Sequence, residues 1–191
     1  MVKLMKRIPL KMVRKDLLNI PQFSLPDGYR IKLFEKGDEQ HWARVETSVG
    51  EFENEEAALE RFNKEFGPYL DDMTKRCVFI ENKDGEVIAT TTAWYGDLLG
   101  DGEISGRIHW VGVTPKYQGQ KLAKPLLSEA MNILAEHHSK AYLTSQTTSY
   151  QAINMYLNYG FEPFITGPSC DEAWSMLEDV LNRKIIMSDK H

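Results

Sequence analysis

The sequence predicts one α/β (α+β) domain with a mixed, mostly antiparallel central sheet and helices on both faces. Three observations lead to this fold class. Runs rich in β-branched and aromatic residues alternate with amphipathic helical runs, a hairpin loop joins two of the strands, and a long helix precedes the later strands. The chain has 191 residues, 42% of them hydrophobic, which is enough for one sizeable core and too little for two ordinary domains.

The first third of the chain predicts one strand and two helices. Residues 29–34 alternate apolar and polar side chains after the turn-forming segment 25–28, as expected of a strand. A helix follows at 38–48. A second helix, 54–66, begins at Asn54, a preferred cap residue, carries apolar side chains three and four positions apart, and ends at a Gly-Pro pair. Its acidic side is expected to face solvent.

The middle of the chain predicts a hairpin and a further strand. The β-rich runs 77–81 and 86–95 are separated by a four-residue loop, which favours an antiparallel hairpin. Segment 96–103 contains acidic residues but has neither the spacing of an EF-hand nor the GK[ST] of a nucleotide-binding loop. We interpret it as a connection between strands. The next strand is predicted at 108–113.

The last third predicts alternating helices and strands. Apolar residues recur at helical spacing over 122–137, and a strand follows at 141–146. A short helix, 151–159, ends at Gly160, the usual left-handed cap residue. The remaining predicted elements are a strand at 161–166 and an amphipathic helix at 172–184.

Charge and cysteine content exclude several classes of protein. The chain has 23 Lys and Arg against 28 Asp and Glu, a net charge of −5, which gives no overall electrostatic case for nucleic-acid binding. Cys77 and Cys170 lack CxxC spacing and a nearby histidine, so we expect neither a disulfide framework nor a metal site. No apolar stretch is long enough for a membrane span or a signal peptide, so the expected location is the cytoplasm.

The N-terminal segment differs from the rest in charge. Residues 1–15 carry six basic side chains and no acid, whereas 51–72 is strongly acidic. The basic segment keeps no clean helical period and no aromatic residues between its charges, so a solvated or packed arm is favoured over a membrane or nucleic-acid tether. We therefore divide the chain into a basic arm, 1–26, and a single domain, 27–191. The arm packs on the domain, reaches a neighbour or stays mobile.

The most informative stretch is 111–123, VGVTPKYQGQKLA, in which a strand runs through a tight turn into a long helix. Helix N-termini present N–H groups without intrahelical partners and a partial positive charge, which suits a phosphate or pyrophosphate. Gly119 allows a close approach, and Pro125 would clash inside a regular helix, which should therefore begin no earlier than about that residue. The N–H groups of 119–124 are then free to bind an anion.

A second motif, AINMYLNYGF at 152–161, places a tyrosine on a short helix that ends in Gly-Phe. Together the two motifs resemble the GCN5-related N-acetyltransferase (GNAT) superfamily, which has V-x-P-x-Y-[RQ]-G-x-G-x-[GA] at its pyrophosphate loop and A-x-x-x-Y-x-x-x-G-F downstream. The resemblance covers about residues 29–166. It implies the GNAT-like acyltransferase fold and direct transfer of an acetyl group from the cosubstrate acetyl-CoA to a primary amine.

For the donor, the resemblance implies that the backbone of Val111 and Val113 pairs with the pantetheine arm and that Gly112 permits a bulge that opens the sheet. Lys121 departs from the family pattern, which has glycine there, and its ammonium can pair with a CoA phosphate as a point charge. The residues expected to contact acetyl-CoA are Val111, Gly112, Val113, Gln118, Gly119, Gln120, Lys121, Leu122, Ala123, Lys124 and Asn154.

The catalytic candidates also follow from the resemblance. Tyr156 matches the family's usual general acid, since a phenol of pKa near ~10 can protonate the departing thiolate; the alternative is a tyrosine that only packs. His109, in a segment similar to arylalkylamine acetyltransferases, alternates with the two valines that follow it and should share their face of the strand. It is a candidate base with a pKa near ~6.5, or a hydrogen-bonded sheet residue. Glu103 and Asp97 are rival bases.

The acceptor is expected near the acidic helices 38–48 and 54–66 and the loop 96–103, whose negative charge would attract a cationic amine of a small molecule or a peptide. No nucleic-acid or membrane partner is expected, and a homodimer is left open. The alternative function is a non-catalytic acyl-CoA-binding module that regulates or binds a partner. Lys121 and the predicted C-terminal helix favour it, because family members usually close with a strand.

Overall fold

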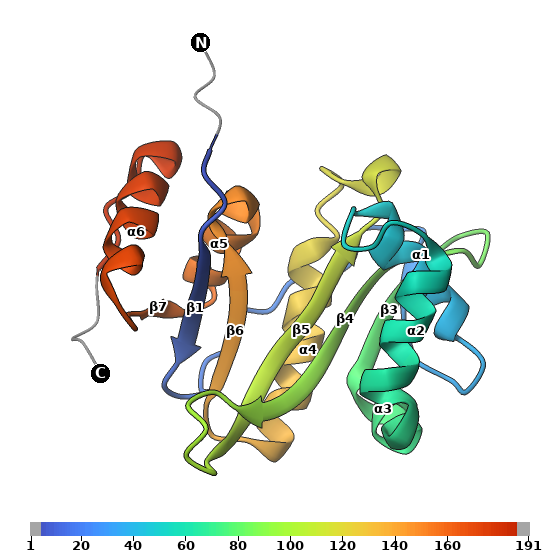
Figure 1. Cartoon of the computed structure of the whole chain (residues 1–191). Coiled ribbons are helices and arrows are strands. Elements are labelled where there is room, and N and C mark those ends of the chain that lie inside the picture. The colour runs from blue at the N-terminus through green and yellow to red at the C-terminus, as the bar shows by residue number, and fades with distance from the viewer. Residues whose placement is uncertain (1–4, 187–191) are drawn as a thin grey trace.

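Seven strands form one sheet in the spatial order β2-β3-β4-β5-β6-β1-β7 (Figure 1). The computed structural model describes residues 5–186. The strands are β1 Pro9–Arg14, β2 Tyr29–Leu33, β3 Cys77–Asn82, β4 Val87–Asp97, β5 Ile104–Val113, β6 Ala141–Gln146 and β7 Glu162–Phe164. The helices are α1 Glu39–Ser48, α2 Glu55–Phe66, α3 Leu70–Arg76, α4 Ala123–His137, α5 Tyr150–Asn158 and α6 Pro168–Leu181.

Neighbouring strands run antiparallel, except that β5 and β6 run parallel. The predicted mixed, mostly antiparallel sheet is therefore confirmed. The predicted hairpin is formed by β3 and β4, and the N–H of Asn82 donates to the carbonyl of Glu86 at 2.9 Å to close its loop. The one parallel pair needs a long crossover, which α4 provides on the far side of the sheet in Figure 1.

Strand β3 shows how the sheet separates two cores. Val78 belongs to a buried cluster that includes Leu126 of α4, whereas its neighbour Phe79 belongs to a second cluster with Trp42 of α1 and Phe62 of α2. Successive side chains of a strand point to opposite faces, so this alternation buries both faces of the sheet. Helices cover both faces, as the sequence predicted.

Strand β1, which the sequence analysis assigned to a basic arm, lies inside the sheet between β6 and β7. Ile8, Leu10 and Met12 are buried and recur at every second position, which is the period of a strand. A search for a helical period misses this pattern. Three alternatives were left open for the arm, and residues 9–14 follow the first of them, because they pack on the domain as a strand of its sheet. Lys3 lies outside the described residues.

Several boundaries differ from those expected. β5 begins at Ile104 rather than at 108, β7 is shorter than 161–166, and α3 was not predicted. The last helix begins at Pro168, before the expected range 172–184, because proline suits the first turn of a helix, where its missing N–H leaves no hydrogen bond unmade. Among the helices of residues 5–186, none has the length and apolar composition to cross a membrane.

Candidate active site

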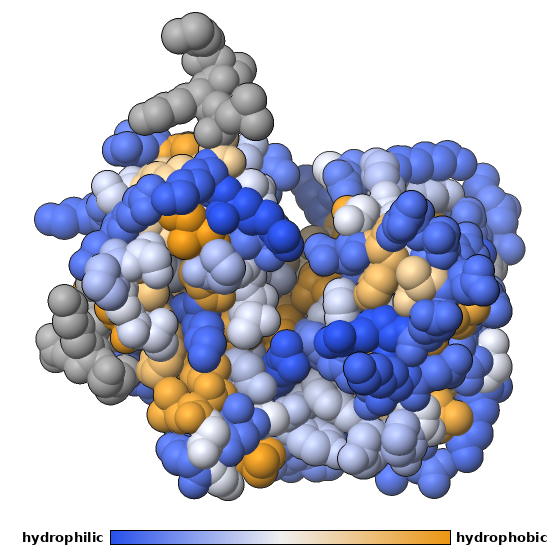
Figure 2. Space-filling view, viewed as in Figure 1, coloured by the Kyte–Doolittle hydropathy of each residue, from blue (hydrophilic) through white to orange (hydrophobic). Residues whose placement is uncertain are grey.

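Strands β5 and β6 separate partway along their length and open a cavity in the sheet. They pair only at Gly106 with Ala141 and at Arg107 with Tyr142. Beyond these pairs, the free edge of β5 has no partner strand among the described residues. A cavity of about 280 Å³ lies in this opening, lined by residues of α1, α2, β5, β6 and α5. Figure 2 shows a hollow between the two halves of the molecule in this region.

A bulge interrupts β5 beside the cavity. Its register with β4 shifts between Thr90 and Thr92, so that Trp110 and Val111 stand opposite a single residue. Trp110 has a φ of 52°, and its indole packs against two aromatic rings. The predicted bulge at Gly112 is therefore misplaced, because Gly112 stays paired with Thr90 and aromatic packing holds the left-handed backbone at a tryptophan instead.

The bulge also separates His109 from the valines that follow it. The extra residue changes the alternation of side chains along the strand. His109 faces α2, with its ring centroid 6.1 Å from that of Phe66. Val111 and Val113 pack against the other core, on the side of α4. The expectation that these three side chains share one face is therefore wrong.

His109 and Glu65 form a buried pair. Nε2 of His109 lies 2.5 Å from Oε1 of Glu65. The second carboxylate oxygen, Oε2, accepts hydrogen bonds from Nε of Arg61 at 2.8 Å and from Nε1 of Trp110 at 3.3 Å. The acidic side of α2 was expected to face solvent, and Glu65 is the exception, because it lies on the turn of the helix that contacts β5.

The surroundings of the pair set its protonation. Burial lowers the pKa of His109 and outweighs the opposing hydrogen bond from Glu65. Burial raises the pKa of Glu65, but hydrogen bonds from His109 and Arg61 outweigh it and hold that pKa at about 2. A neutral imidazole therefore donates its Nε2 proton to an ionised carboxylate, which leaves Nδ1 as a proton acceptor.

Helix α5 brings Tyr156 to the same cavity. The side chain is 6% exposed, and its ring centroid lies 6.1 Å from that of Phe161. Burial, with the nearby carboxyl groups of Glu46 and Glu51, raises the pKa of the phenol above its ordinary value, so the proton stays on oxygen. The hydroxyl has no hydrogen-bond partner among the described residues.

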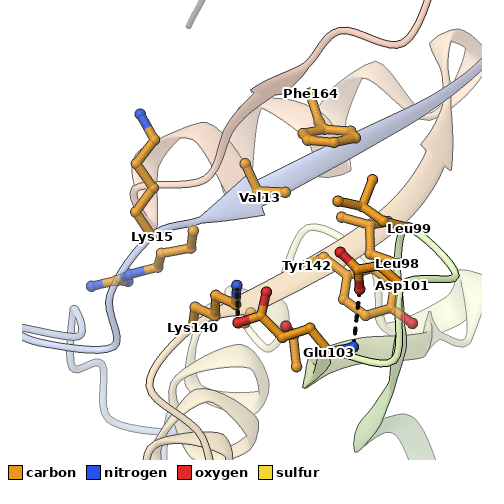
Figure 3. A pocket seen from close by; sticks show the side chains of 12 residues that line it. Val13, Lys15, Leu98, Leu99, Asp101, Glu103, Lys140, Tyr142 and Phe164 are labelled. Carbon is orange, nitrogen blue, oxygen red and sulfur yellow. Dashed lines mark hydrogen bonds and ion pairs between the residues drawn. The ribbon is translucent and has the colours of Figure 1, made fainter. Parts of the chain in front are cut away.

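The two rival bases lie elsewhere. Glu103 forms an ion pair with Lys140, at 2.6 Å, on the wall of a second cavity of about 390 Å³ (Figure 3). Asp97 accepts hydrogen bonds from N–H groups of its own loop. These hydrogen bonds lower its pKa, and the one from Gly102 has the largest effect. Neither carboxylate lines the cavity of His109 and Tyr156, so both are removed from the set of candidate bases.

The loop before α4 presents free backbone groups. None of the N–H groups from Gly119 to Lys124 makes a hydrogen bond with a described residue. Gly119 has a φ of 78°, and α4 begins at Ala123, directly after the buried Leu122. Pro125 lies in the first turn, where it is tolerated. The free N–H groups and the positive end of the helix together form a site suited to an anion.

Lys121 takes the backbone conformation of the glycine that it replaces. Its φ is 64°, in the left-handed region that glycine favours. Placing a residue with a Cβ there costs roughly 1–2 kcal/mol. The loop therefore keeps its turn despite the substitution, and the lysine side chain is exposed.

Two glutamines of the loop are used within the protein. Nε2 of Gln118 donates to the carbonyl of Val113 at 2.9 Å, so this carbonyl, expected to pair with the pantetheine arm, already has a partner. Oε1 of Gln120 accepts a hydrogen bond from the hydroxyl of Tyr29 at 2.5 Å. These side chains hold the loop against β2 and β5, while the backbone N–H groups stay free.

Two further residues predicted to contact the donor also have partners. The ammonium of Lys124 lies 4.9 Å from the ring centroid of Phe23. Oδ1 of Asn154 accepts a hydrogen bond from Nη1 of Arg183 at 3.0 Å, which ties α5 to the segment after α6. Asn154 does not line the cavity.

Among the residues of the cavity wall that the sequence analysis missed is Glu46. It lies on the buried face of α1 with Trp42 and Val45, and both of its carboxyl oxygens are buried without a hydrogen-bond partner among the described residues. Burial, reinforced by Glu51, raises its pKa to about 8. A glutamate on the apolar stripe of a predicted helix is the signal that could have found it.

Comparison with known proteins agrees with this geometry. The family model described as Acetyltransferase (GNAT) family matches residues 27–161. A mycothiol acetyltransferase of Streptomyces griseus subsp. griseus is 26% identical over 159 residues, which covers 80% of this chain and 50% of that protein. A mycothiol acetyltransferase of Kocuria rhizophila is 27% identical over 161 residues, which covers 81% of this chain and 53% of that protein. This chain thus spans about half the length of these relatives.

Among solved structures, a GCN5-related N-acetyltransferase from Sphaerobacter thermophilus has the same fold. Its TM-score is 0.58 at 21% identity, over 73% of this chain and 42% of that chain. The family model covers both motifs on which the resemblance rested, the loop at 111–123 and the motif at 152–161. The chain belongs to the Acetyltransferase (GNAT) family.

Proposed function

We propose that this chain is an acetyl-CoA-dependent N-acetyltransferase that moves an acetyl group directly from the thioester to a primary amine. One observation carries the proposal. The free edge of β5 and the side chains of Tyr156 and His109 meet around one opening of the sheet, and the loop with the free N–H groups follows the end of β5 along the chain. The similarity to proteins named mycothiol acetyltransferase supports acetyl transfer as the reaction.

Acetyl-CoA would supply the acetyl group as an activated thioester. The N–H groups of 119–124 and the positive end of α4 suit its pyrophosphate, and the exposed ammonium of Lys121 is free to pair with a phosphate. Along β5, the free edge at Val111 suits an extended amide chain that adds to the sheet as a strand would. The residues present therefore fit this cosubstrate.

His109 and Tyr156 divide the proton transfers. His109 accepts a proton from the acceptor ammonium at Nδ1, and Glu65 holds the ring and stabilises its charged form. Tyr156 gives its proton to the leaving sulfur. The phenolate then takes the remaining proton from the nitrogen that has received the acetyl group, which returns the phenol to its starting state. His109 releases its proton to solvent and becomes neutral again.

The acceptor is a cationic amine of a small molecule or a peptide. Glu46 and Glu51 line the cavity and place two carboxyl groups on one wall, which suits a cationic amine. The loop 96–103, which was also expected to attract the acceptor, borders the second cavity instead (Figure 3). The acidic contribution therefore comes from α1 and from the segment that follows it.

The non-catalytic alternative loses its two supports. Lys121 adopts the turn conformation of glycine, so its side chain leaves the loop open. Helix α6 packs Trp174 and Leu177 into the core and contributes no side chain to the cavity of Tyr156. Neither departure from the family pattern therefore favours the non-catalytic alternative.

A thiol-release assay tests this function. The purified chain is incubated with acetyl-CoA and a panel of alkylamines, amino sugars and short peptides, beside alcohols of matched size, and the acetylated product is identified by mass. We expect thiol release that depends on the amine and is absent with the alcohols. Tight acetyl-CoA binding with no transfer to any amine would contradict the proposal and favour the non-catalytic module.

A further inference from the structure

Glu46 is an acidic residue of the cavity wall whose two carboxyl oxygens are both buried without a partner. Its side chain is 0% exposed, and no described residue donates a hydrogen bond to either carboxyl oxygen. Buried polar groups are almost always hydrogen-bonded, and leaving one unpaired destabilises the folded state. The cavity beside Glu46 therefore suits a ligand that brings hydrogen-bond donors.

The cationic side chains of the cavity contact other groups, and Nε of Arg107 is buried without a hydrogen-bond partner. Nε of Arg61 donates to Oε2 of Glu65 at 2.8 Å. The guanidinium carbon of Arg107 lies 5.7 Å from the ring centroid of Tyr142. Neither arginine pairs with Glu46 within the described part of the chain. The carboxyl of Glu46 is thus left for a ligand to pair with.

Gly112 places the carboxyl of Glu46 directly against β5. A Cβ added at Gly112 would lie 3.0 Å from Oε1 of Glu46, so the glycine leaves the space that the carboxyl occupies. This contact is next to the bulge at Trp110 and Val111, where the free edge of the strand faces the opening. Glu46 therefore lies beside the strand proposed to hold the donor and shares its cavity with Tyr156.

We propose that Glu46 binds the ammonium group of the acceptor and so makes a cationic amine the substrate class of this site. The inference rests on the proposed N-acetyltransferase function and assigns acceptor selection to one residue. An ammonium brings three donors and a positive charge, whereas an alcohol brings one donor and no charge. When the cation enters, the carboxyl ionises and its proton passes to solvent, with no change in any other bond.

The proton release is assigned to the carboxyl of Glu46, because it is buried against the cavity without a hydrogen-bond partner. Burial and Glu51 hold the pKa of Glu46 at about 8, so its carboxyl is mostly neutral near pH 6.5. Burial keeps the pKa of His109 below its ordinary value and raises the pKa values of the Cys77 thiol and the Tyr156 phenol. The charged and titratable groups that surround Glu46 are Glu51, Arg61, Cys77, Arg107, His109 and Tyr156.

Calorimetric titration of the full chain tests the proposal, with n-butylammonium chloride as the cationic probe and n-butanol as the neutral probe. At pH 6.5, two buffers of different ionisation enthalpy give the number of protons released. We expect the wild-type chain to bind the ammonium at least tenfold more tightly than the alcohol and to release close to one proton. Glu46→Gln should lose at least tenfold in ammonium affinity and release no proton.

The matched control is Glu56→Gln, which makes the same substitution in the exposed first turn of α2 and should stay within twofold of the wild type. CoA binding is measured separately for each chain. If the wild-type chain did not bind CoA, the proposed function would be contradicted. The amine titration, which is done without CoA, would still decide the role of Glu46.

Equal ammonium affinity in Glu46→Gln and the wild type, or no ammonium binding by the wild type, would overturn the proposal. Circular dichroism checks that the variant folds. If it does not, the proton count of the wild-type chain decides, because ammonium binding without proton release would mean that no carboxyl ionises on entry.

Discussion

The donor side and the acceptor side of the cavity are built from different groups. On the donor side, the free edge of β5 borders the opening, the loop after β5 carries the free backbone N–H groups of 119–124, and Gly119 and Lys121 set its turn. On the acceptor side, Glu46 of α1 and the pair of His109 and Glu65 provide buried side chains from separate elements. A backbone site depends on local conformation, whereas a side-chain site depends on individual charges.

This difference separates the expected effects of substitution. Changes in the loop before α4 should alter acetyl-CoA binding in proportion to their effect on the turn. Changes on the acceptor side should leave acetyl-CoA binding intact and alter turnover or amine selection. A loop substitution that alters amine selection, or an acceptor-side substitution that alters acetyl-CoA binding, would show that the two sides are coupled.

The largest effect is expected for Tyr156→Phe. Loss of the phenolic proton should lower kcat by about 10²–10⁴-fold. The hydroxyl has no hydrogen-bond partner among the described residues, so folding and acetyl-CoA affinity should stay close to the wild type. Steady-state thiol release and calorimetry measure the two quantities. A kcat within threefold of the wild type would show that another group protonates the leaving thiolate.

Substitutions of His109 and Glu65 should have two different effects, one on kcat and one on its dependence on pH. His109→Gln removes the proposed base and should lower kcat by about 10²-fold. Glu65→Gln removes the carboxylate that raises the pKa of His109, so the acidic limb of kcat against pH should move to lower pH. Rate profiles from pH 5 to 9 measure this shift. A profile unchanged in Glu65→Gln would mean that His109 is not the titrating base.

Glu46 should also make stability depend on pH. Its pKa is about 8 in the folded chain against 4.5 for an ordinary glutamate, so the folded state holds the proton more tightly. Stability contributed by this group is therefore lost as pH rises from about 4.5 to 8. Between pH 5 and 8 the Tm of the wild type should fall by several degrees more than that of Glu46→Gln. Parallel melting curves would contradict the buried, neutral carboxyl.

The smallest effect is expected for Lys121→Gly. Glycine relieves the left-handed backbone, which favours the folded chain by roughly 1 kcal/mol, but removes a cation from the loop. We expect a Tm higher by about 2–4 °C and acetyl-CoA affinity lower by about two- to fivefold. Lys121→Asn, which tolerates this conformation without the charge, is the control and should show the same loss of affinity. Equal affinity in all three chains would remove Lys121 from the donor site.

The two sides also differed in how far the sequence predicted them. The loop at 111–123 is contiguous, so its strand, turn and helix could be inferred from neighbouring residues, and the free N–H groups follow from that order. The pair of His109 and Glu65 joins α2 to β5 across a large sequence separation, and a single sequence gives no sign of such contacts. The acidic face of α2 was therefore assigned to solvent.

The errors in the fold have similar causes. Strand β1 was missed because its buried residues repeat with a period of two inside a basic segment, where charge dominated the interpretation. The bulge was assigned to Gly112 because glycine favours left-handed backbone, but the left-handed residue is Trp110, two residues earlier, whose indole packs against the rings of Trp42 and Phe52. Tertiary contacts decided both cases.

Titration of acetyl-CoA into the wild-type chain and into Gly119→Val tests the central claim most directly, because it needs no knowledge of the acceptor. The account predicts micromolar or tighter binding to the wild type and at least tenfold weaker binding to the variant, since valine does not fit a φ of 78°. ATP, which lacks the pantetheine arm, should bind more weakly than acetyl-CoA. No acetyl-CoA binding to the wild type, or equal binding to both chains, would contradict a donor site formed by the loop before α4.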